Sequence, residues 1–242
     1  MLKFKPFILF TLFFTIALLS VGCETTTLTG SGKVVTQEKA ITGFDRVEVR
    51  TGFTVDVRQG ETFSVVIRVD DNIVEHLHVL KVGSTLKIGL NPERIYRIRQ
   101  ATLEAEVTMP NLAGLALSES SQGTITGFKS AQPVEISLSG NSSLQGDIEA
   151  GRSSFELSGG SEVALVGSAQ AVTIDASGNS IVNLTDIPVT DANVLLSGGS
   201  EATVNPSGRL DVQASGNSYL YYLGKPTMGM VGTSGGSSVE AK

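Results

Sequence analysis

A four-residue motif, Ser-Gly-[Asn/Gly]-Ser, recurs through the second half of this 242-residue chain. Its copies begin at Ser139, Ser158, Ser177, Ser197, Ser215 and Ser234, and a degenerate copy begins at Ser118. Successive copies are 21, 19, 19, 20, 18 and 19 residues apart. Self-similarity at a fixed period of this size predicts a repeat architecture in which each unit stacks on its neighbours.

Apolar residues line up at the same places around every copy of the motif. One column lies three residues before the motif and includes Ile136, Phe155, Ile174, Val194 and Val212. Others follow every second residue, which is the spacing of a strand and not of a helix. A single unit buries too little apolar surface to offset the entropy of ordering it, so the units must stack. The repeat therefore predicts an all-β fold, a single-stranded parallel β-helix with rungs of about 19 residues over residues 117–242.

The motif itself reads as the corner between two strands of one rung. Stacked rungs lie about 4.8 Å apart, so equivalent corner residues form ladders. The glycine permits a positive φ at each corner, and the alternating Asn and Gly after it lets an amide reach across a rung that has no side chain. We expect a structural ladder of Ser142, Ser161, Ser180, Ser200, Ser218 and Ser237 with Asn141, Asn179 and Asn217. We expect the unequal repeat lengths to be absorbed on a third side, where Val134, Val172, Ala192 and Leu210 are the remnants of apolar alternation.

Residues 41–116 lack the motif but still alternate like strands, for example at Phe53-Val55-Val57 and Leu86-Ile88-Leu90. We interpret this region as longer strands that open the same β-helix and cap its first rung, because an exposed first edge invites aggregation. Residues 71–77 are expected to form one short helical turn. A separate small β-domain is the alternative.

The amino terminus has the pattern of an export signal. Lys3 and Lys5 precede an apolar run that ends in small residues just before Cys23, the only cysteine of the chain. The stretch Leu19-Ser20-Val21-Gly22-Cys23 resembles a lipobox, although Ser20 stands where leucine is usual. We expect residues 1–22 to be a lipoprotein signal peptide, Cys23 to carry the lipid, and residues 23–40 to be a flexible tether. A plain secretory signal and an uncleaved anchor are the alternatives.

The composition excludes several classes of function. One cysteine rules out an intrachain disulfide scaffold, and two histidines make chemistry that needs several imidazoles improbable. A formal charge of −6 argues against a nucleic-acid partner, because nucleic-acid-binding proteins are usually basic. We expect no cofactor and no metal.

The repeats resemble a known family. The segment Ile41-Thr42-Gly43-Phe44-Asp45, the strand around Val55, Leu86-Lys87-Ile88 and the Leu-Ser-Gly-x-Ser repeats are similar to the head GIN domain family of putative auto-transporter adhesins, over roughly residues 43–238. The resemblance implies an exported or lipid-anchored bacterial protein with a right-handed parallel β-helix. It implies no catalytic or binding residues, because the activity of the family is not established.

Three surface features could carry chemistry. His76 and His78, two residues apart on one strand face, could hold a metal with Glu75, and acidic residues near the corners could hold calcium; solvent-facing roles explain both better. Arg94, Arg97 and Arg99 with Tyr96 form a basic patch that could contact anionic lipid headgroups or acidic glycans. The motif serines lack a histidine nearby in sequence to activate them, which argues against nucleophilic catalysis.

These observations favour a non-catalytic module anchored in the cell envelope by its lipid, serving adhesion or the binding of polysaccharide or protein. The first alternative is a structural component that self-associates through the ends of the β-helix as a homo-oligomer. A polysaccharide-active enzyme is the second, disfavoured because basic residues are scattered through the repeats.

Overall fold

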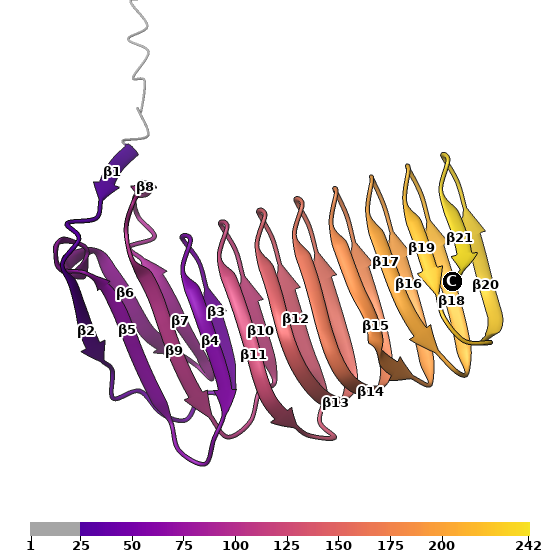
Figure 1. Cartoon of the computed structure of the whole chain (residues 1–242), viewed down its shortest axis with the longest axis horizontal. Coiled ribbons are helices and arrows are strands. Elements are labelled where there is room, and N and C mark those ends of the chain that lie inside the picture. Colours follow the sequence, from indigo (N-terminus) through magenta and orange to yellow (C-terminus); the bar gives the residue numbers. More distant parts are fainter. Residues whose placement is uncertain (1–24) are drawn as a thin grey trace, which may run out of the picture.

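The computed structural model describes residues 25–242, and nearly all of this chain is built from β-strands stacked into one elongated β-helix (Figure 1). The all-β parallel β-helix predicted from the repeat is confirmed. In the repeat region each coil has a strand before the Ser-Gly corner and a strand after it. These strands are β10 (Gly114–Leu117), β11 (Gln122–Lys129), β12 (Val134–Leu138), β13 (Ser143–Leu157), β14 (Glu162–Ala176), β15 (Ile181–Val189), β16 (Asp191–Leu196), β17 (Glu201–Pro206), β18 (Arg209–Ala214), β19 (Tyr219–Tyr222), β20 (Thr227–Thr233) and β21 (Ser238–Ala241).

The coils stack in the register that the apolar columns predict. Leu138 pairs with Leu157, Leu157 with Ala176, and Ala176 with Leu196, each one coil further along. These side chains are all buried, as is the column from Ile136 to Val212. The interior is therefore a continuous apolar spine, to which every coil contributes the same positions.

The unequal repeat lengths are absorbed in the wide return opposite the corners. Three register shifts follow the corner, between Ile125 and Phe128, between Ala164 and Val166, and between Asn183 and Pro188, and one precedes it, between Leu210 and Val212. The expected remnants of a third side are not there. Val134, Val172, Ala192 and Leu210 instead lie in the regular strands before the corner, where all four are buried.

Residues 41–116 share the sheets and the core of the repeats. Their elements are β3 (Arg46–Val49), β4 (Thr54–Gln59), β5 (Ser64–Asp70), the 3₁₀ helix η1 (Asp71–His76), β6 (Leu77–Val82), β7 (Thr85–Leu90), β8 (Ile95–Arg99) and β9 (Leu103–Met109). The coil made by β3 and β4 lies between two later ones. β3 pairs with β7 on one side and β10 on the other, and β4 pairs with β9 and β11. The order of coils in space therefore differs from their order in the chain.

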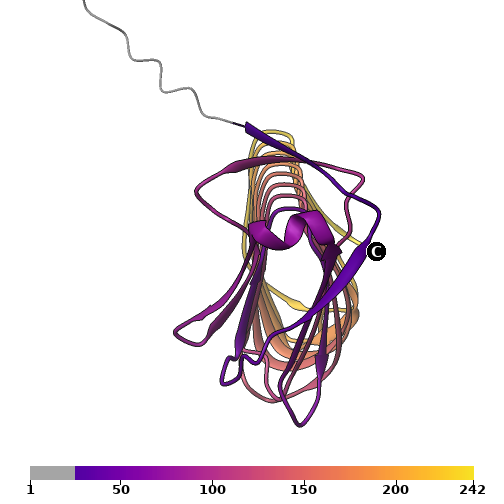
Figure 2. The same ribbon diagram turned by 90° about the vertical axis from the view of Figure 1, so that its left-hand side faces the viewer.

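A cap closes the end of the β-helix at β7 and β9. β6 runs antiparallel to β7, and β5 runs antiparallel to β9. The helix η1 connects β5 to β6 across the opening, as the view along the β-helix shows (Figure 2), and its Ile73 is fully buried. The short helical turn expected at residues 71–77 is thus present, and it seals the first rung.

The flexible tether predicted over residues 23–40 is wrong for the part that the structure describes. β1 (Thr25–Thr29) pairs in parallel with β8, and β2 (Val34–Glu38) pairs antiparallel with β5. Leu28 is buried, and the turn between the two strands donates its Gly32 amide to the Asp70 carboxylate at 2.6 Å. The small polar residues of β1 and β2 therefore belong to strands at the edges of the sheets and do not form a linker. The predicted signal peptide and Cys23 lie outside the described residues. No helix in residues 25–242 is long and apolar enough to cross a bilayer.

Candidate functional site

The corner serines of the repeats are buried and hydrogen-bonded within their own coils. Their hydroxyls donate to the backbone carbonyl three residues earlier at 2.8–2.9 Å, in Ser142, Ser161, Ser180, Ser200 and Ser218. Ser237 in the last coil is half-buried, and its oxygen accepts from the Ser218 amide at 3.1 Å. These hydroxyls form a stack but do not link rung to rung through one another. Apart from Ser237, their donors are used inside the protein and burial keeps them out of reach of a ligand, so their role is structural.

The alternation of Asn and Gly after each corner glycine has a steric cause. A Cβ at Gly160 would lie 2.7 Å from the Asn141 Oδ1, and one at Gly199 would lie 2.6 Å from the Asn179 Oδ1. Asn217 stands in the same relation to Gly236, at 3.0 Å. Each amide therefore lies over a rung that must lack a side chain, which is the arrangement expected from the sequence.

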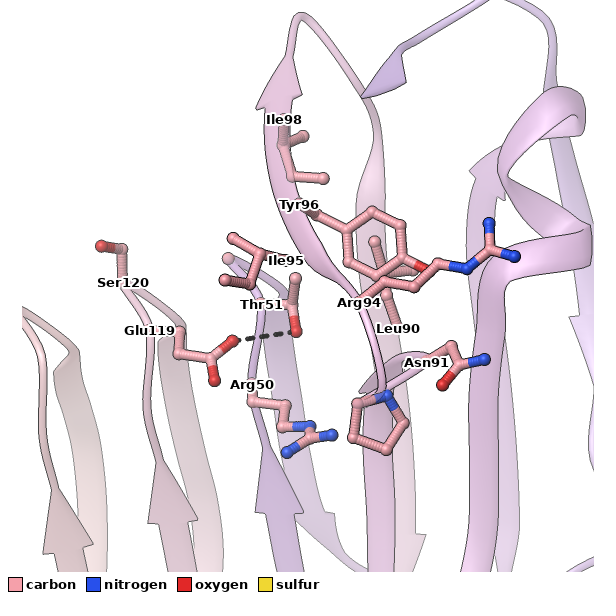
Figure 3. A pocket seen from close by; sticks show the side chains of 12 residues that line it. Arg50, Thr51, Leu90, Asn91, Arg94, Ile95, Tyr96, Ile98, Glu119 and Ser120 are labelled. Atoms are coloured by element: carbon pink, nitrogen blue, oxygen red, sulfur yellow. Dashed lines mark hydrogen bonds between the residues drawn. The ribbon is translucent and has the colours of Figure 1, made fainter. Parts of the chain in front are cut away.

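A pocket opens where one coil lacks a tight corner. Between β7 and β9 the chain makes an excursion over residues 91–102 that includes β8, instead of turning through four residues. The hollow between this excursion and the neighbouring corners has a volume of about 490 Å³. Figure 3 shows the side chains that line it, from the excursion on one side and from the corners at residues 50–52 and 119–120 on the other.

The pocket combines apolar walls with a few polar groups. Leu90, Pro92, Ile95 and Ile98 supply the apolar surface, and Ile95 is half exposed. On the opposite rim the Thr51 hydroxyl donates to the Glu119 carboxylate at 3.1 Å (Figure 3). This hydrogen bond holds the acidic side chain close to the neighbouring corner at residues 50–52. A pocket of this size and make-up is the usual form of a small-ligand site.

The Tyr96 hydroxyl and the Arg50 guanidinium, which both belong to the pocket residues, lack a hydrogen-bond or ion-pair partner within residues 25–242. The Tyr96 hydroxyl is buried without a hydrogen bond, although the ring packs edge-on against His76 with centroids 5.7 Å apart. The Arg50 guanidinium has no carboxylate within ion-pair distance. Its stem passes over Gly89, where an added Cβ would lie 2.7 Å from the Arg50 Cγ. The stem of Arg50 is thus held in place over Gly89, and no carboxylate within residues 25–242 neutralises its guanidinium charge.

The basic patch seen in the sequence lies on the two-stranded sheet of β1 and β8. One face of this sheet carries Leu28, Tyr96 and Ile98 and packs on the body. The other face is exposed and carries Thr25, Thr27, Thr29, Ile95, Arg97 and Arg99. Arg97 and Arg99 of the predicted patch therefore lie together on an ordered sheet beside the pocket, whereas Tyr96 faces the body and Arg94 lines the pocket just before β8.

The histidines do not share a strand face. His76 ends η1 and lies 3.8 Å from the Glu75 carboxylate, whereas His78 is in β6. No group of three potential metal ligands exists within residues 25–242, so neither the histidine site nor the calcium site has a counterpart in that part of the chain.

Ion pairs on the outer faces tie neighbouring coils together. Arg46 donates to Glu135 at 2.7 Å across Gly114, where a Cβ would lie 2.8 Å from the arginine nitrogen. The hydrogen bond and charge of Arg46 lower the pKa of Glu135, and Glu135 raises the pKa of Arg46 in turn. Lys87 and Glu48 form a similar pair at 2.7 Å. These pairs lie at the surface, where they link the outer faces of neighbouring coils.

Comparison with known proteins settles the family. Residues 43–226 match the model of a family described as "Putative auto-transporter adhesin, head GIN domain". The chain belongs to this family. Its membership confirms the resemblance found in the repeats and indicates an exported protein of the cell envelope. No curated protein matches the chain.

Solved structures of similar fold include proteins described as putative adhesins and one described as a putative lipid-binding protein. A putative adhesin from Bacteroides fragilis NCTC 9343 has a TM-score of 0.81 at 18% identity, covering 89% of this chain and 100% of that one. A putative lipid-binding protein from Parabacteroides distasonis ATCC 8503 has a TM-score of 0.71 at 17% identity, covering 90% and 100%. A putative adhesin from Parabacteroides merdae ATCC 43184 has a TM-score of 0.67 at 16% identity, covering 89% and 99%. At these identities the likeness shows the fold alone.

Proposed function

We propose that this protein is a non-catalytic binding module of the cell envelope, anchored by lipid on Cys23, which uses the pocket beside β8 to hold an acidic sugar of a glycan. The availability of the Arg50 guanidinium beside the apolar walls of the pocket carries this proposal. A guanidinium binds a carboxylate through paired, charge-assisted hydrogen bonds. The Tyr96 ring and the aliphatic walls suit the apolar face of a sugar, and Asn91 and the Tyr96 hydroxyl supply polar contacts.

The arrangement of charged groups supports a binding role over a catalytic one. Within the described chain, Glu119 is the pocket's only carboxylate, and it is engaged by Thr51. Glycoside hydrolysis usually needs a pair of carboxylates flanking the bond. Family membership among adhesins agrees with a binding role.

Binding of the full lipidated protein to an array of acidic and neutral glycans tests the proposal. We expect selective binding of acidic glycans, a loss of about 10- to 100-fold in Arg50→Ala, and no loss in Arg152→Ala, an exposed arginine of the repeats. Arg50→Lys should recover part of the affinity. Absence of binding to every glycan, equal affinity in Arg50→Ala, or release of new reducing ends from a bound glycan would each contradict the proposal.

A second surface is an alternative site for the glycan, and the same binding experiment distinguishes the two sites. A shallow polar groove of about 280 Å³ crosses four neighbouring coils on the outer face and includes Gln122 and Gln145. If Gln122→Ala with Gln145→Ala abolishes glycan binding while Arg50→Ala does not, the ligand lies along the coils and the pocket assignment is wrong.

Self-association is a second candidate function, favoured by the exposure of β20. Its Met228, Met230 and Val231 are 40%, 59% and 47% exposed, and within residues 25–242 β20 pairs only with β18. An uncovered strand edge with apolar side chains is a template for pairing with a second copy. Light scattering of the purified protein tests this; we expect a dimer that Met230→Lys dissociates, and a monomer at high concentration contradicts it.

A further inference from the structure

Of the side chains on the exposed face of the β1–β8 sheet, only Ile95 also lines the glycan pocket. We propose that this face rests on the anionic lipid headgroups of the membrane that holds the Cys23 anchor, so that the β-helix is docked on the bilayer instead of swinging from it. The inference rests on the lipid anchor proposed above. It names a second contact with the membrane and the residues that make it.

The distance between anchor and sheet is short. Cys23 is two residues before Thr25, where β1 begins. Two residues span at most about 7 Å of extended chain. Thr25 is the register partner of Ile95, so a lipid on Cys23 places the beginning of β8 next to the headgroups.

The charges on this face are complementary to an anionic surface. Arg97 and Arg99 project from it beside Thr27 and Thr29, and Arg94 is exposed just before β8. None of the three arginines has an ion-pair partner in the part of the chain that the structure describes. With this face on the membrane, both guanidinium groups lie within one Debye length of the lipid phosphates, where salt screens the attraction little.

The apolar component of the same face is Ile95, which is 50% exposed. An isoleucine between arginines can enter the boundary between headgroups and acyl chains while the guanidinium groups stay with the phosphates. The threonines of β1 add short polar side chains that do not hinder a close approach to the membrane surface.

The orientation of this face is fixed relative to the body. Leu28 is buried beneath the sheet, and the Gly30 amide donates to the Arg99 carbonyl at 3.1 Å. The buried Asp70 carboxylate accepts from the amides of Gly32 and Thr102, at 2.6 and 2.7 Å, just after each strand. A membrane contact at this face therefore sets the direction in which the whole β-helix points.

The contact is expected to be weak without the anchor and substantial with it. Each arginine close to an anionic membrane favours the bound state by roughly fivefold, so Arg97 and Arg99 together favour docking by about thirtyfold. That is too little to recruit a free protein firmly. It is enough to hold down a body that the lipid already keeps at the surface.

Fluorescence quenching in nanodiscs tests the docking on the full lipidated protein. Since Cys23 is the only cysteine and is consumed by the lipid, one introduced cysteine carries one fluorophore. The label is placed at Thr27→Cys, on the docked face, or at Gln213→Cys, an exposed position in a distant coil. Discs of phosphatidylglycerol or phosphatidylcholine contain a lipid with a quencher on its headgroup.

We expect strong quenching at position 27 in phosphatidylglycerol discs, less in phosphatidylcholine discs, and little at position 213 in either. Arg97→Glu with Arg99→Glu should reduce the signal at position 27 to its value in neutral discs. The matched control Arg152→Glu, which reverses an exposed, unpaired arginine far from the sheet, should leave it unchanged.

Two results would overturn the docking. One is equal quenching at positions 27 and 213, and the other is quenching at position 27 that depends neither on lipid charge nor on Arg97 and Arg99. Failure of the anchor gives a different result, because the wild-type chain would then take up the fluorophore at Cys23 and leave the discs.

Discussion

The Ser161 hydroxyl donates a hydrogen bond of 2.8 Å to the Ser158 carbonyl across one corner of the β-helix. Both residues belong to one copy of the repeated motif, and Ser161 is fully buried. The bond satisfies the hydroxyl of a buried side chain at the point where the chain turns from one strand into the next. The same bond in the stacked corners explains why the last residue of the motif is always serine in this chain.

Replacing this hydroxyl should destabilise the stack. We expect Ser161→Ala to lower the free energy of unfolding by about 1 kcal/mol, because the carbonyl loses its donor. For a chain of this length that corresponds to a fall of roughly 2–4 °C in the melting temperature. Thermal unfolding followed by circular dichroism measures it, with Ser168→Ala, at an exposed serine of β14, the strand that follows this corner, as the control. Equal melting temperatures for the two variants would contradict a structural role of the bond.

A side chain at a corner glycine should be more harmful. Gly198 has a φ of +72°, and an added Cβ would lie 2.6 Å from the Gly178 carbonyl oxygen. We expect Gly198→Ala to cost about 1–3 kcal/mol from the left-handed backbone alone, and more from the clash with the rung below. Gly232→Ala is the control, since nothing lies within 4 Å of its added Cβ. Urea unfolding that ranks Gly232→Ala as the worse variant would show the corner geometry to be wrong.

The cap should depend on Asp70. Its buried carboxylate accepts two backbone amides, and removal leaves both donors without their partner. We expect Asp70→Ala to destabilise the cap by about 1.5–3 kcal/mol and to speed amide hydrogen exchange at Gly32 and Thr102 while exchange in β13 and β14 is unchanged. Asp71→Ala, which removes the more exposed carboxylate next to it, should have the smaller effect. Uniform exchange changes along the chain would contradict a local role.

The carboxylate of Asp211 should make the later coils sensitive to acid. The Arg209 guanidinium and then the Met230 amide, which donates at 2.7 Å, hold the pKa of Asp211 below its usual value. A carboxyl group with a lowered folded-state pKa contributes stability above the unfolded-state pKa of about 3.9, and that contribution is lost as the pH falls through the folded value.

Melting curves between pH 7 and pH 2 measure this contribution. Asp211→Asn should be less stable than the wild type at pH 7 and should lose less stability than the wild type on acidification. Asp175→Asn, at an exposed aspartate on the neighbouring outer face, is the control and should follow the wild type. A difference in stability between Asp211→Asn and the wild type that stays the same from pH 7 to pH 2 would show that the charge of Asp211 is not involved.

The repeat made the architecture predictable because its signal is local and periodic. Each 19-residue unit carries its own apolar columns and its own corner, so Leu157, Ala176 and Leu196 could be assigned to adjacent coils without knowledge of distant contacts. The steric pairing of Asn141 with Gly160 could be anticipated for the same reason.

The parts that were missed depend on pairings between distant segments. Nothing in Thr25–Thr29 shows that its partner is Ile95–Arg99, and its Thr-rich composition is also that of a linker. The pocket is assembled from three segments, at residues 50–52, 90–98 and 119–120, and Arg50 stands out only once they are together. The arginines of β8 were the one feature of the sequence that indicated a binding surface in this part of the molecule.

The position of β3 and β4 between strands that come later in the chain has a consequence for secretion. Their edges stay open until residues 85–129 have arrived, because β7, β9, β10 and β11 supply every parallel partner. A polypeptide that emerges amino terminus first cannot complete its rungs one by one from that end. Interrupted export before Met109 would leave two bare strand edges exposed to neighbouring chains, which makes this step the one most in need of a chaperone.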